Sequence, residues 1–292
     1  MKKMVNINTD DLKITIPTDT IGVDMGYSLS KIVFFKGSEM VFTSYSTHEE
    51  LSLIEEFLES KTATHKKVNF TGGKCFKLFQ TYKTKLKSQL LNEFEANVKG
   101  VEILYRLEKK NELPPSLIVT IGTGTSMVST KEKVEHLGGT ALGGGFFMGM
   151  IKILFNISDF KEAINLAKRG NRYDVDLKVS DIYDPQDNRV NMIFREFTAA
   201  SLGKIDLNYN TNNLKKESFI SSLICMIGEN IGTISNLMAD TNNLSNIVFC
   251  GGFLKENKIV KNMLSLLCSV NRKNAVFLKN SEYSAAIGAL FL

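Results

Sequence analysis

Tryptophan is absent from this chain of 292 residues, and histidine and cysteine are scarce, with three and four copies. No two cysteines form a C-x-x-C pair, and their neighbours are mostly apolar, which is typical of reduced, buried thiols rather than of a disulfide framework. So few nitrogen and sulfur ligands argue against a zinc-type site. The residues concerned are His48, His65, His136, Cys75, Cys225, Cys250 and Cys268.

Long hydrophobic runs are also lacking. No apolar run approaches the roughly 18 residues that suggest a membrane-spanning helix. Residues 1–18 are polar and contain no apolar core of a secretory signal, so we expect a short, partly ordered extension there. These absences predict a cytoplasmic protein that does not engage a membrane.

Charge of one sign is only mildly in excess. The formal net charge is +5, from 36 basic and 31 acidic residues spread along the chain. This excess suits an anionic small-molecule ligand but is too small and too dispersed to indicate nucleic-acid binding. The densest basic stretch, residues 74–87, has apolar residues between its lysines and is interpreted as an amphipathic, solvated segment.

Glycine, by contrast, is gathered in three places. Residues 22–28 and 122–126 each follow an apolar run of strand character, and residues 138–145 precede a long apolar helix. Glycine lets backbone N–H groups approach a phosphate closely, and a helix N-terminus adds partial positive charge. Two such loops, about a hundred residues apart on similar patterns, predict a nucleotide held between two similar domains.

The order of predicted elements repeats in the same way. Strand, glycine turn, strand and strand begin at both Thr20 and Leu117. The dipeptide Pro114-Pro115 separates the halves, so we predict an extension at 1–18, a first domain at 19–115 and a second at 116–292. Predicted strands are 20–24, 31–36, 40–45, 67–71, 117–120, 126–129, 134–137, 247–250 and 275–278; predicted helices are 48–60 with Thr47 as N-cap, 90–109, 145–155, 159–169, 191–202, 218–238, 258–267 and 282–292.

Several collinear motifs are more specific than any single loop. They are DMGYSLSK from Asp24, NEFEANVKG from Asn92, IGTGTS from Ile121, GTALGGG from Gly139, LAKRG from Leu166, DLKVSDIY from Asp176, FTAA from Phe197 and AAIGAL from Ala285. Over residues 20–292 the chain resembles the type II, eukaryotic-like pantothenate kinases. The resemblance implies an α/β fold of two duplicated RNase H-like domains, that of the actin-like ATPases, with the nucleotide in the cleft between them.

The resemblance also implies a reaction, which is the ATP-dependent phosphorylation of the pantothenate hydroxyl in the first step towards coenzyme A. Glu93 matches the general base of the family, Asp24 a carboxylate that helps to hold Mg²⁺, and Lys31 a residue near the transferred phosphate. A carboxylate base is chemically suitable because a primary alcohol must lose its proton as the new P–O bond forms.

The remaining site residues follow from the same resemblance. The predicted ATP contacts are Asp24, Gly26, Ser28, Lys31, Gly122, Thr123, Gly124, Gly144, Gly145, Phe146, Phe147, Met148, Phe160 and Gly251; the predicted pantothenate contacts are Thr123, Ser126 and His136. For residues 146–148 and for Phe160, packing in the core is an equally open interpretation. A homodimer and inhibition by CoA or acyl-CoA are expected from the resemblance alone.

Two departures from the family pattern keep alternatives open. Tyr27 stands where the family has a second glycine, at a position for which positive φ is conceivable. His136 replaces a substrate-contacting arginine, and a neutral histidine offers one donor without a fixed charge. A shifted hairpin register would bring Lys133 there instead. The alternatives are a kinase of another acceptor, such as pantetheine or an amino sugar, and a non-catalytic protein that binds ATP or acyl-CoA.

Overall fold

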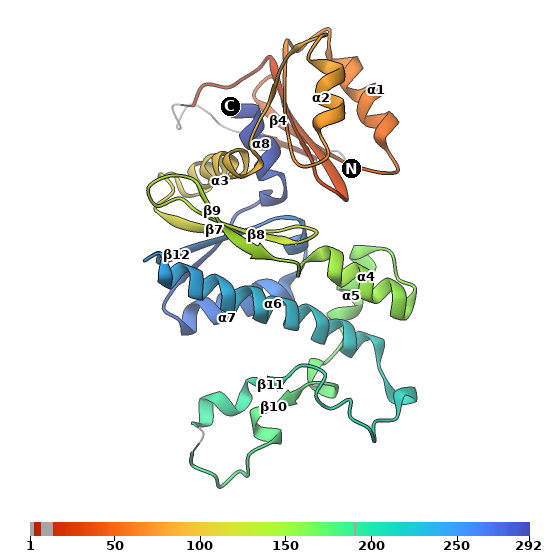
Figure 1. Cartoon of the computed structure of the whole chain (residues 1–292), viewed down its shortest axis with the longest axis vertical. Coiled ribbons are helices and arrows are strands. Elements are labelled where there is room, and N and C mark those ends of the chain that lie inside the picture. The colour runs from red at the N-terminus through yellow and green to blue at the C-terminus, as the bar shows by residue number, and fades with distance from the viewer. Residues whose placement is uncertain (1–2, 7–13, 190) are drawn as a thin grey trace.

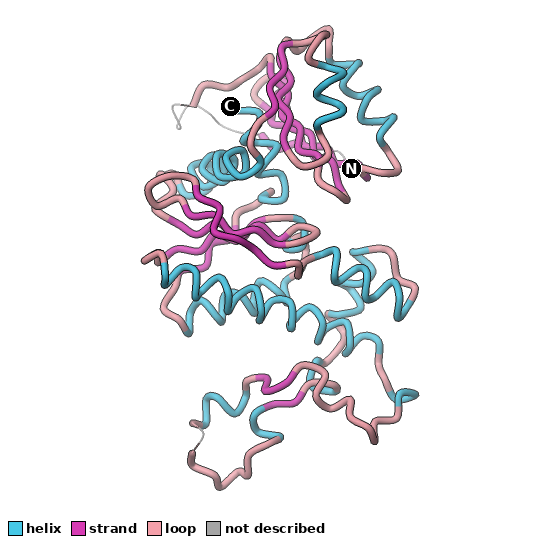
Figure 2. The backbone as a smooth tube through the Cα atoms, viewed as in Figure 1, coloured by secondary structure: helices cyan, strands magenta, loops and turns pink. Residues whose placement is uncertain are grey.

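Two β-sheets, one above the other in Figure 1, organise the molecule. The computed structural model describes residues 3–6, 14–189 and 191–292. Within these residues, the first sheet has six strands in the order β1-β4-β3-β2-β5-β6, and the second has five in the order β13-β12-β7-β8-β9. Figure 2 shows the strands of both sheets in magenta with helices between and outside them.

The first half of the chain builds the upper sheet and ends in a helix that leaves it. Four antiparallel strands come first, and two parallel strands follow, each reached through a helix. The elements are β1 (Lys3–Asn6), β2 (Thr20–Met25), β3 (Leu29–Lys36), β4 (Glu39–Ser46), α1 (Leu51–Lys61), β5 (Lys67–Thr71), α2 (Phe76–Tyr82), β6 (Lys87–Leu90) and α3 (Glu93–Lys109).

The second half repeats this order. Its sheet order β9-β8-β7-β12-β13 matches β4-β3-β2-β5-β6, and a helix again follows the last strand. The predicted duplication is thereby confirmed. The elements are β7 (Ser116–Ile121), β8 (Thr125–Ser129), β9 (Glu135–Thr140), α4 (Gly144–Phe155), α5 (Phe160–Ala167), β10 (Leu177–Lys178), β11 (Thr198–Ala200), α6 (Lys216–Thr241), β12 (Asn246–Cys250), α7 (Lys258–Val270), β13 (Asn274–Phe277) and α8 (Ser284–Phe291).

Three hydrophobic cores separate the layers. One lies outside the first sheet under α1 and α2, and another outside the second sheet under α4 to α7. The third lies between the sheets and is filled by α3 and α8. The central strand β7 supplies apolar side chains to two of these cores, Ile118 to the middle one and Val119 to the outer one. Ile21 and Val23 of β2 both pack into the core under α1 and α2.

The helices α3 and α8 cross in this middle layer at backbone contact. A Cβ added to Gly100 would lie 1.7 Å from the carbonyl oxygen of Ser284, and one added to Gly288 would lie 1.6 Å from that of Ala96. Only glycine permits so close an approach. The two helices join the halves of the chain, because α3 follows the first sheet while α8, at the end of the chain, packs against β2 of that sheet.

An excursion between α5 and α6 lies below the second lobe in Figure 1 and contains the short pair β10 and β11. Its base is held by a buried ionic network. Arg172 Nε donates to Asp176 Oδ2 at 2.6 Å, and its two terminal nitrogens donate to Glu229 at 2.8 and 3.2 Å. Asp176 also accepts from Ser222 Oγ and from the amide of Leu202, so the buried charges are well partnered.

Most predicted elements are confirmed within a few residues, and two predictions are wrong. Residues 192–196 form a 3-10 helix and Thr198–Ala200 a strand, where a helix over 191–202 was predicted. Thr47 is not the N-cap of α1; that position is Glu50, and Thr47 contacts the first glycine loop instead. The division of the domains at 115/116 stays a prediction.

One helix, α6, is long and apolar enough to cross a membrane by length and composition. The protein itself covers 72% of its most apolar window, as expected for a core helix of a folded domain. By length and composition this helix departs from the sequence-based expectation that no apolar run is long enough to cross a membrane, but its apolar residues pack mostly inside the protein.

Replacing Gly288 by alanine is expected to destabilise the protein, because the new Cβ would collide with the backbone of α3. Overpacking of this kind costs about 1–3 kcal/mol or more. The matched control is Gly149→Ala at an exposed position of α4, where an added Cβ meets nothing within 4 Å. This variant is expected to be neutral or to stabilise the protein by up to ~1 kcal/mol. Urea denaturation measures the stability of both variants. An unfolding midpoint of Gly288→Ala equal to that of wild type would contradict the close backbone contact between α3 and α8.

Candidate active site

Two glycine loops from opposite halves of the chain meet between the sheets. The first, residues 26–28, joins β2 to β3, and the second, residues 122–124, joins β7 to β8. The hydroxyl oxygens of Ser28 and Thr123 lie 3.0 Å apart, within hydrogen-bond distance, although 95 residues separate them. The structure thus brings together the two loops that sequence analysis assigned to phosphate binding.

Thr47 holds the first loop in shape. Its hydroxyl donates to the carbonyl oxygen of Gly26 at 3.0 Å, and its amide donates to that of Ser28 at the same distance. The buried hydroxyl of Ser30 is a third partner at 3.0 Å. The hydroxyl and the backbone amide of Thr47 thus each satisfy one loop carbonyl, a supporting role that sequence analysis missed.

Tyr27 does not strain the first loop. The described non-glycine residues with positive φ do not include it, so the predicted conflict between a bulky residue and a left-handed backbone does not arise. Its ring, which is 62% exposed, packs edge-on against His48 with centroids 4.9 Å apart. The ammonium of Lys74 lies 5.4 Å from the same ring.

Four loop amides are available to a ligand. No hydrogen bond among the described residues uses the backbone N–H of Tyr27, Ser28, Thr123 or Gly124. Amides that point out of tight turns form an anion-binding concavity, because several donors converge on one acceptor. The paired loops can therefore donate to phosphate oxygens from both lobes.

The third glycine stretch packs closely against the second loop. The amides of Gly144 and Gly145 donate to the carbonyl oxygens of Gly122 and Thr123 at 2.7 and 2.9 Å. A Cβ on Gly143 would lie 2.7 Å from the latter oxygen. These residues therefore support the second loop from behind, and direct nucleotide contact by Gly144 and Gly145 stays a prediction.

Asp24 and Lys31 form a buried ion pair beside the first loop. They face each other across the β2–β3 ladder, and Lys31 Nζ lies 3.2 Å from Asp24 Oδ2. Burial by itself would lower the pKa of Lys31, but the carboxylates of Asp24 and, further away, Glu282 raise it above the ordinary value. Lys31 is therefore a fixed positive charge.

Glu93 is the first residue of α3 and belongs to the same electrostatic cluster. Removal of hydration by neighbouring groups raises the pKa of its carboxyl, and the nearby Asp24 carboxylate raises it further, while Lys31 acts in the opposite direction. The side chain nevertheless keeps substantial exposure to solvent. A carboxylate of raised pKa that is open to a ligand is suited to accept a proton.

The start of α3 is fixed by a cap that sequence analysis did not assign. Asn92 Oδ1 accepts from the amides of Phe94 at 2.9 Å and Glu95 at 3.2 Å. An asparagine directly before two early acidic residues is a readable N-cap signal, so the sequence contained it.

The Phe94 ring stacks on His136 of β9, with centroids 4.2 Å apart and planes 11° from parallel.

The predicted acceptor contacts lie on the two strands after the second loop. Ser126 of β8 pairs with Gly139 of β9 in the ladder. Between Met127 and Val128 the register shifts, so that β9 carries one extra residue next to His136. This bulge does not place Lys133 at the position of His136, since Lys133 lies exposed in the turn before β9. A role for Lys133 in place of His136 at the acceptor stays a prediction.

The residues predicted to lie beside the adenosine of ATP are on α4 and on the segments that pack against it. Phe147 is fully buried and packs edge-on against Phe253 at 5.5 Å and Phe160 at 6.1 Å, so it has the core role that was left open. Gly251 has φ +105° at the end of β12, where a Cβ would lie 2.4 Å from the carbonyl oxygen of Ile121. Phe146, Met148 and Phe160 are half-buried against the same core. Nucleotide contact by this group stays a prediction.

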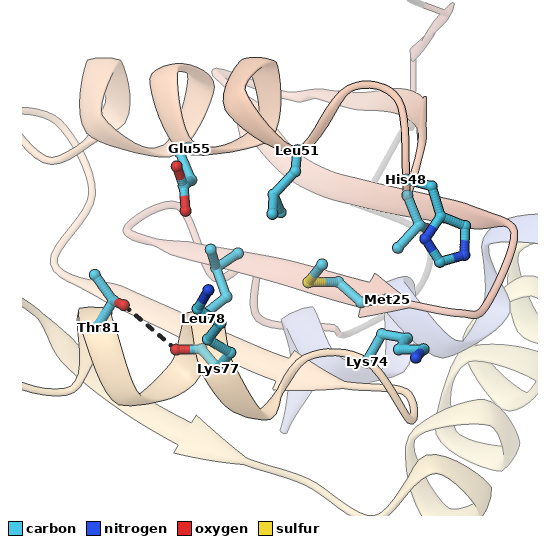
Figure 3. Close-up of a pocket in the computed structure, with 9 residues that line it drawn as sticks. Met25, His48, Leu51, Glu55, Lys74, Lys77, Leu78 and Thr81 are labelled. Carbon is cyan, nitrogen blue, oxygen red and sulfur yellow. Dashed lines mark hydrogen bonds between the residues drawn. The ribbon is translucent and has the colours of Figure 1, made fainter.

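A separate hollow of about 170 Å³ lies on the outer side of the first lobe, between α1 and α2 at the end of β2 (Figure 3). None of the predicted site residues lines it. Apart from the buried Thr47, its polar lining residues, including His48, Lys74 and Lys77, are exposed surface side chains. It therefore differs from the paired loops, where buried charges and open amides converge.

Two similar lobes, each with a glycine loop at its first hairpin, define the class of protein: this is the fold of the actin-like ATPases. The activator of a 2-hydroxyisocaproyl-CoA dehydratase from Clostridium difficile, solved with bound ADPNP, matches with a TM-score of 0.62 at 16% identity, over 93% of this chain and 92% of that one. A ROK family glucokinase from Streptomyces griseus, in complex with glucose and AMPPNP, matches with a TM-score of 0.55 at 12% identity, over 92% and 97%. At such identities the likeness shows the fold alone.

The chain belongs to the Fumble family, whose profile matches residues 37–292. Relatives named type II pantothenate kinase include one from Bacillus cereus (strain AH820), 33% identical over 280 residues, 93% of this chain and 96% of the relative. Another, from Oceanobacillus iheyensis, is 31% identical over 271 residues, 92% of this chain and 98% of the relative. The resemblance deduced from the motifs is thereby confirmed.

Opposite substitutions around Glu93 are expected to move its pKa in opposite directions. Asp24→Asn removes a negative neighbour, so protonation of Glu93 becomes less favourable and its pKa falls. Lys31→Gln removes a positive neighbour, so the pKa rises. NMR titration of a ¹³C-labelled Glu93 carboxyl in the ligand-free protein measures both. Shifts of the same sign in the two variants would contradict the electrostatic cluster.

Proposed function

We propose that this protein transfers the γ-phosphoryl group of ATP to the hydroxyl of pantothenate. The observation that carries the proposal is the convergence of open loop amides from both lobes with the Asp24, Lys31 and Glu93 cluster. The names of the relatives specify the acceptor as pantothenate. Phosphoryl transfer needs positioning and charge stabilisation more than covalent chemistry, and this arrangement supplies both.

The residues present fit a magnesium ion. Lys31 is bound to Oδ2 of Asp24, and the side of Oδ1 faces Gly72, where a Cβ would lie only 2.7 Å from that oxygen. The missing side chain of Gly72 therefore leaves space beside a carboxylate oxygen. Mg²⁺ is commonly held by one or two carboxylates together with phosphate oxygens and water, so Asp24 is sufficient as its protein ligand. When bound, Mg·ATP supplies the phosphoryl group and neutralises part of its charge.

The chain's own groups then have separable roles. The amides of residues 27, 28, 123 and 124 bind and orient phosphate oxygens from both lobes. Lys31 places a fixed positive charge beside the first loop. The Glu93 carboxylate accepts the proton of the acceptor hydroxyl, and its raised pKa brings its basicity closer to that required near neutral pH. Closure of the lobes around the loops excludes water.

The proposal also covers the contacts of the acceptor, the location of the protein, its oligomeric state and its inhibition. His136 and Ser126 lie near the start of α3 and the second loop and are proposed to contact the acceptor. The four cysteines are unpaired and buried, which supports a reducing, cytoplasmic location. A homodimer and inhibition by CoA or acyl-CoA also belong to the proposal, and light scattering and inhibition assays check them.

Glu93→Gln is expected to lower kcat for phosphopantothenate formation by roughly 10²- to 10⁴-fold, because the amide cannot accept the proton. ATP affinity is expected to stay close to that of wild type. The matched control is Glu95→Gln, an exposed acid in the same helical turn, which is expected to keep wild-type kcat. Product is measured by mass spectrometry in an assay with Mg·ATP and pantothenate.

Other acceptors in the same assay separate the alternatives. Turnover of pantetheine or an amino sugar in preference to pantothenate would support a kinase but contradict pantothenate as its acceptor. Tight binding of ATP or CoA without turnover of any acceptor would contradict catalysis. Equal kcat in Glu93→Gln and wild type would contradict the role of the base.

A further inference from the structure

One aromatic contact connects the helix that begins with Glu93 to the opposite lobe. The rings of Phe94, the second residue of α3, and His136, in the edge strand β9, are stacked face to face at 4.2 Å. Phe94 is half-buried against the core between the sheets, and His136 is exposed. The contact therefore lies at the surface where an acceptor must approach Glu93.

Both partners of the stack are placed by specific backbone features. On α3, the Asn92 cap fixes the amide of Phe94. On β9, the register shift pairs Val128 with His136 but Met127 with Gly138, so Leu137 is an extra residue, and Gly138 has φ +132°. A bulge of this kind re-aims the neighbouring side chains. The stack is thus a consequence of structure on both sides rather than of two adaptable surface side chains.

Glu93 itself has little else to fix it. Within the described part of the chain, no hydrogen bond or ion pair to its carboxylate is found, and the side chain is exposed. Its position therefore depends on the first turn of α3. Phe94 is the next residue along that turn, and its ring is the group that contacts β9. Because Phe94 and Glu93 are consecutive residues of one helical turn, holding the Phe94 ring against β9 restrains the backbone that carries Glu93.

We propose that Phe94 is a positioning residue for the reaction, and that its stack on His136 holds Glu93 against the second lobe. The proposal rests on the proposed function, since Glu93 matters only if it accepts the acceptor's proton. Misplacement of a reacting group by about 1 Å can cost on the order of 100-fold in rate. Loss of the stack is therefore expected to lower kcat more than it raises KM for ATP.

The experiment is kcat and KM for Phe94→Ala, Phe94→Tyr, His136→Ala and His136→Phe in the full chain. Phe94→Ala is expected to lower kcat roughly 10- to 100-fold, and Phe94→Tyr, which keeps the ring, to restore most of it. His136→Phe is expected to retain more kcat than His136→Ala, because it keeps a stacking partner. Phe76→Ala, an exposed phenylalanine on α2, is the control expected to match wild type.

A second comparison separates positioning from general damage to the fold. In the Glu93→Gln background, Phe94→Ala is expected to cost little further, because the group that it positions has already been removed. An equal loss in both backgrounds would overturn the proposal, as would a wild-type kcat in Phe94→Ala. If wild type itself forms no phosphorylated product while ATP binds, the proposed function fails instead.

Discussion

The crossing of α3 and α8 is the constraint on which the rest of the structure depends. At Gly100 and Gly288 the two helices touch backbone to backbone. The same α8 lies on β2, where a Cβ on Gly22 would be 2.0 Å from the carbonyl oxygen of Ala286. Because Asp24 lies at the C-terminal end of β2, one residue before its last, and α3 begins with Glu93, this packing sets the relation between the carboxylate proposed to hold the metal and the proposed base.

The charges of the site follow from that geometry. Asp24 and Lys31 are directly opposite each other on neighbouring strands of one ladder, so the backbone pairing places their side chains on the same face of the sheet, within reach of each other. Glu93 comes from a different element and retains exposure, and its pKa is raised by lost hydration and by the Asp24 carboxylate. One carboxylate is thereby paired with Lys31, while the pKa of the other is raised, which suits the separate roles proposed for them in metal binding and in proton transfer.

Much of the fold was predictable because the signals are local. Apolar runs ending in glycine located β2 and β7 with their loops, and the repeated order revealed the duplication. The weak elements were not predicted. The strands β6 and β10 have only four and two residues, and residues 192–196 form a short 3-10 helix where a longer α-helix was predicted. Which core a helix joins is a tertiary property, and residues 284–291 carry no local sign that they pack on the first sheet.

The sequence pointed to the proposed site residues but not to the contacts that support them. Family motifs singled out Asp24, Lys31 and Glu93, whose roles in the reaction stay a proposal. The contacts of Thr47 with the first loop and of Gly144 with the second depend on segments that come together only in the fold. The same is true of Phe94 and His136, which are 42 positions apart (136 − 94) and meet because β9 is bulged.

The most direct test of the account is a crystal structure of the complex with Mg²⁺, a non-hydrolysable ATP analogue and pantothenate. The account predicts phosphate oxygens on the amides of Thr123, Gly124 and Ser28, with Mg²⁺ or its water on Asp24. It also predicts the acceptor hydroxyl within about 3 Å of a Glu93 oxygen. A triphosphate bound away from the paired loops, or an acceptor hydroxyl beyond reach of Glu93 in the closed complex, would contradict it.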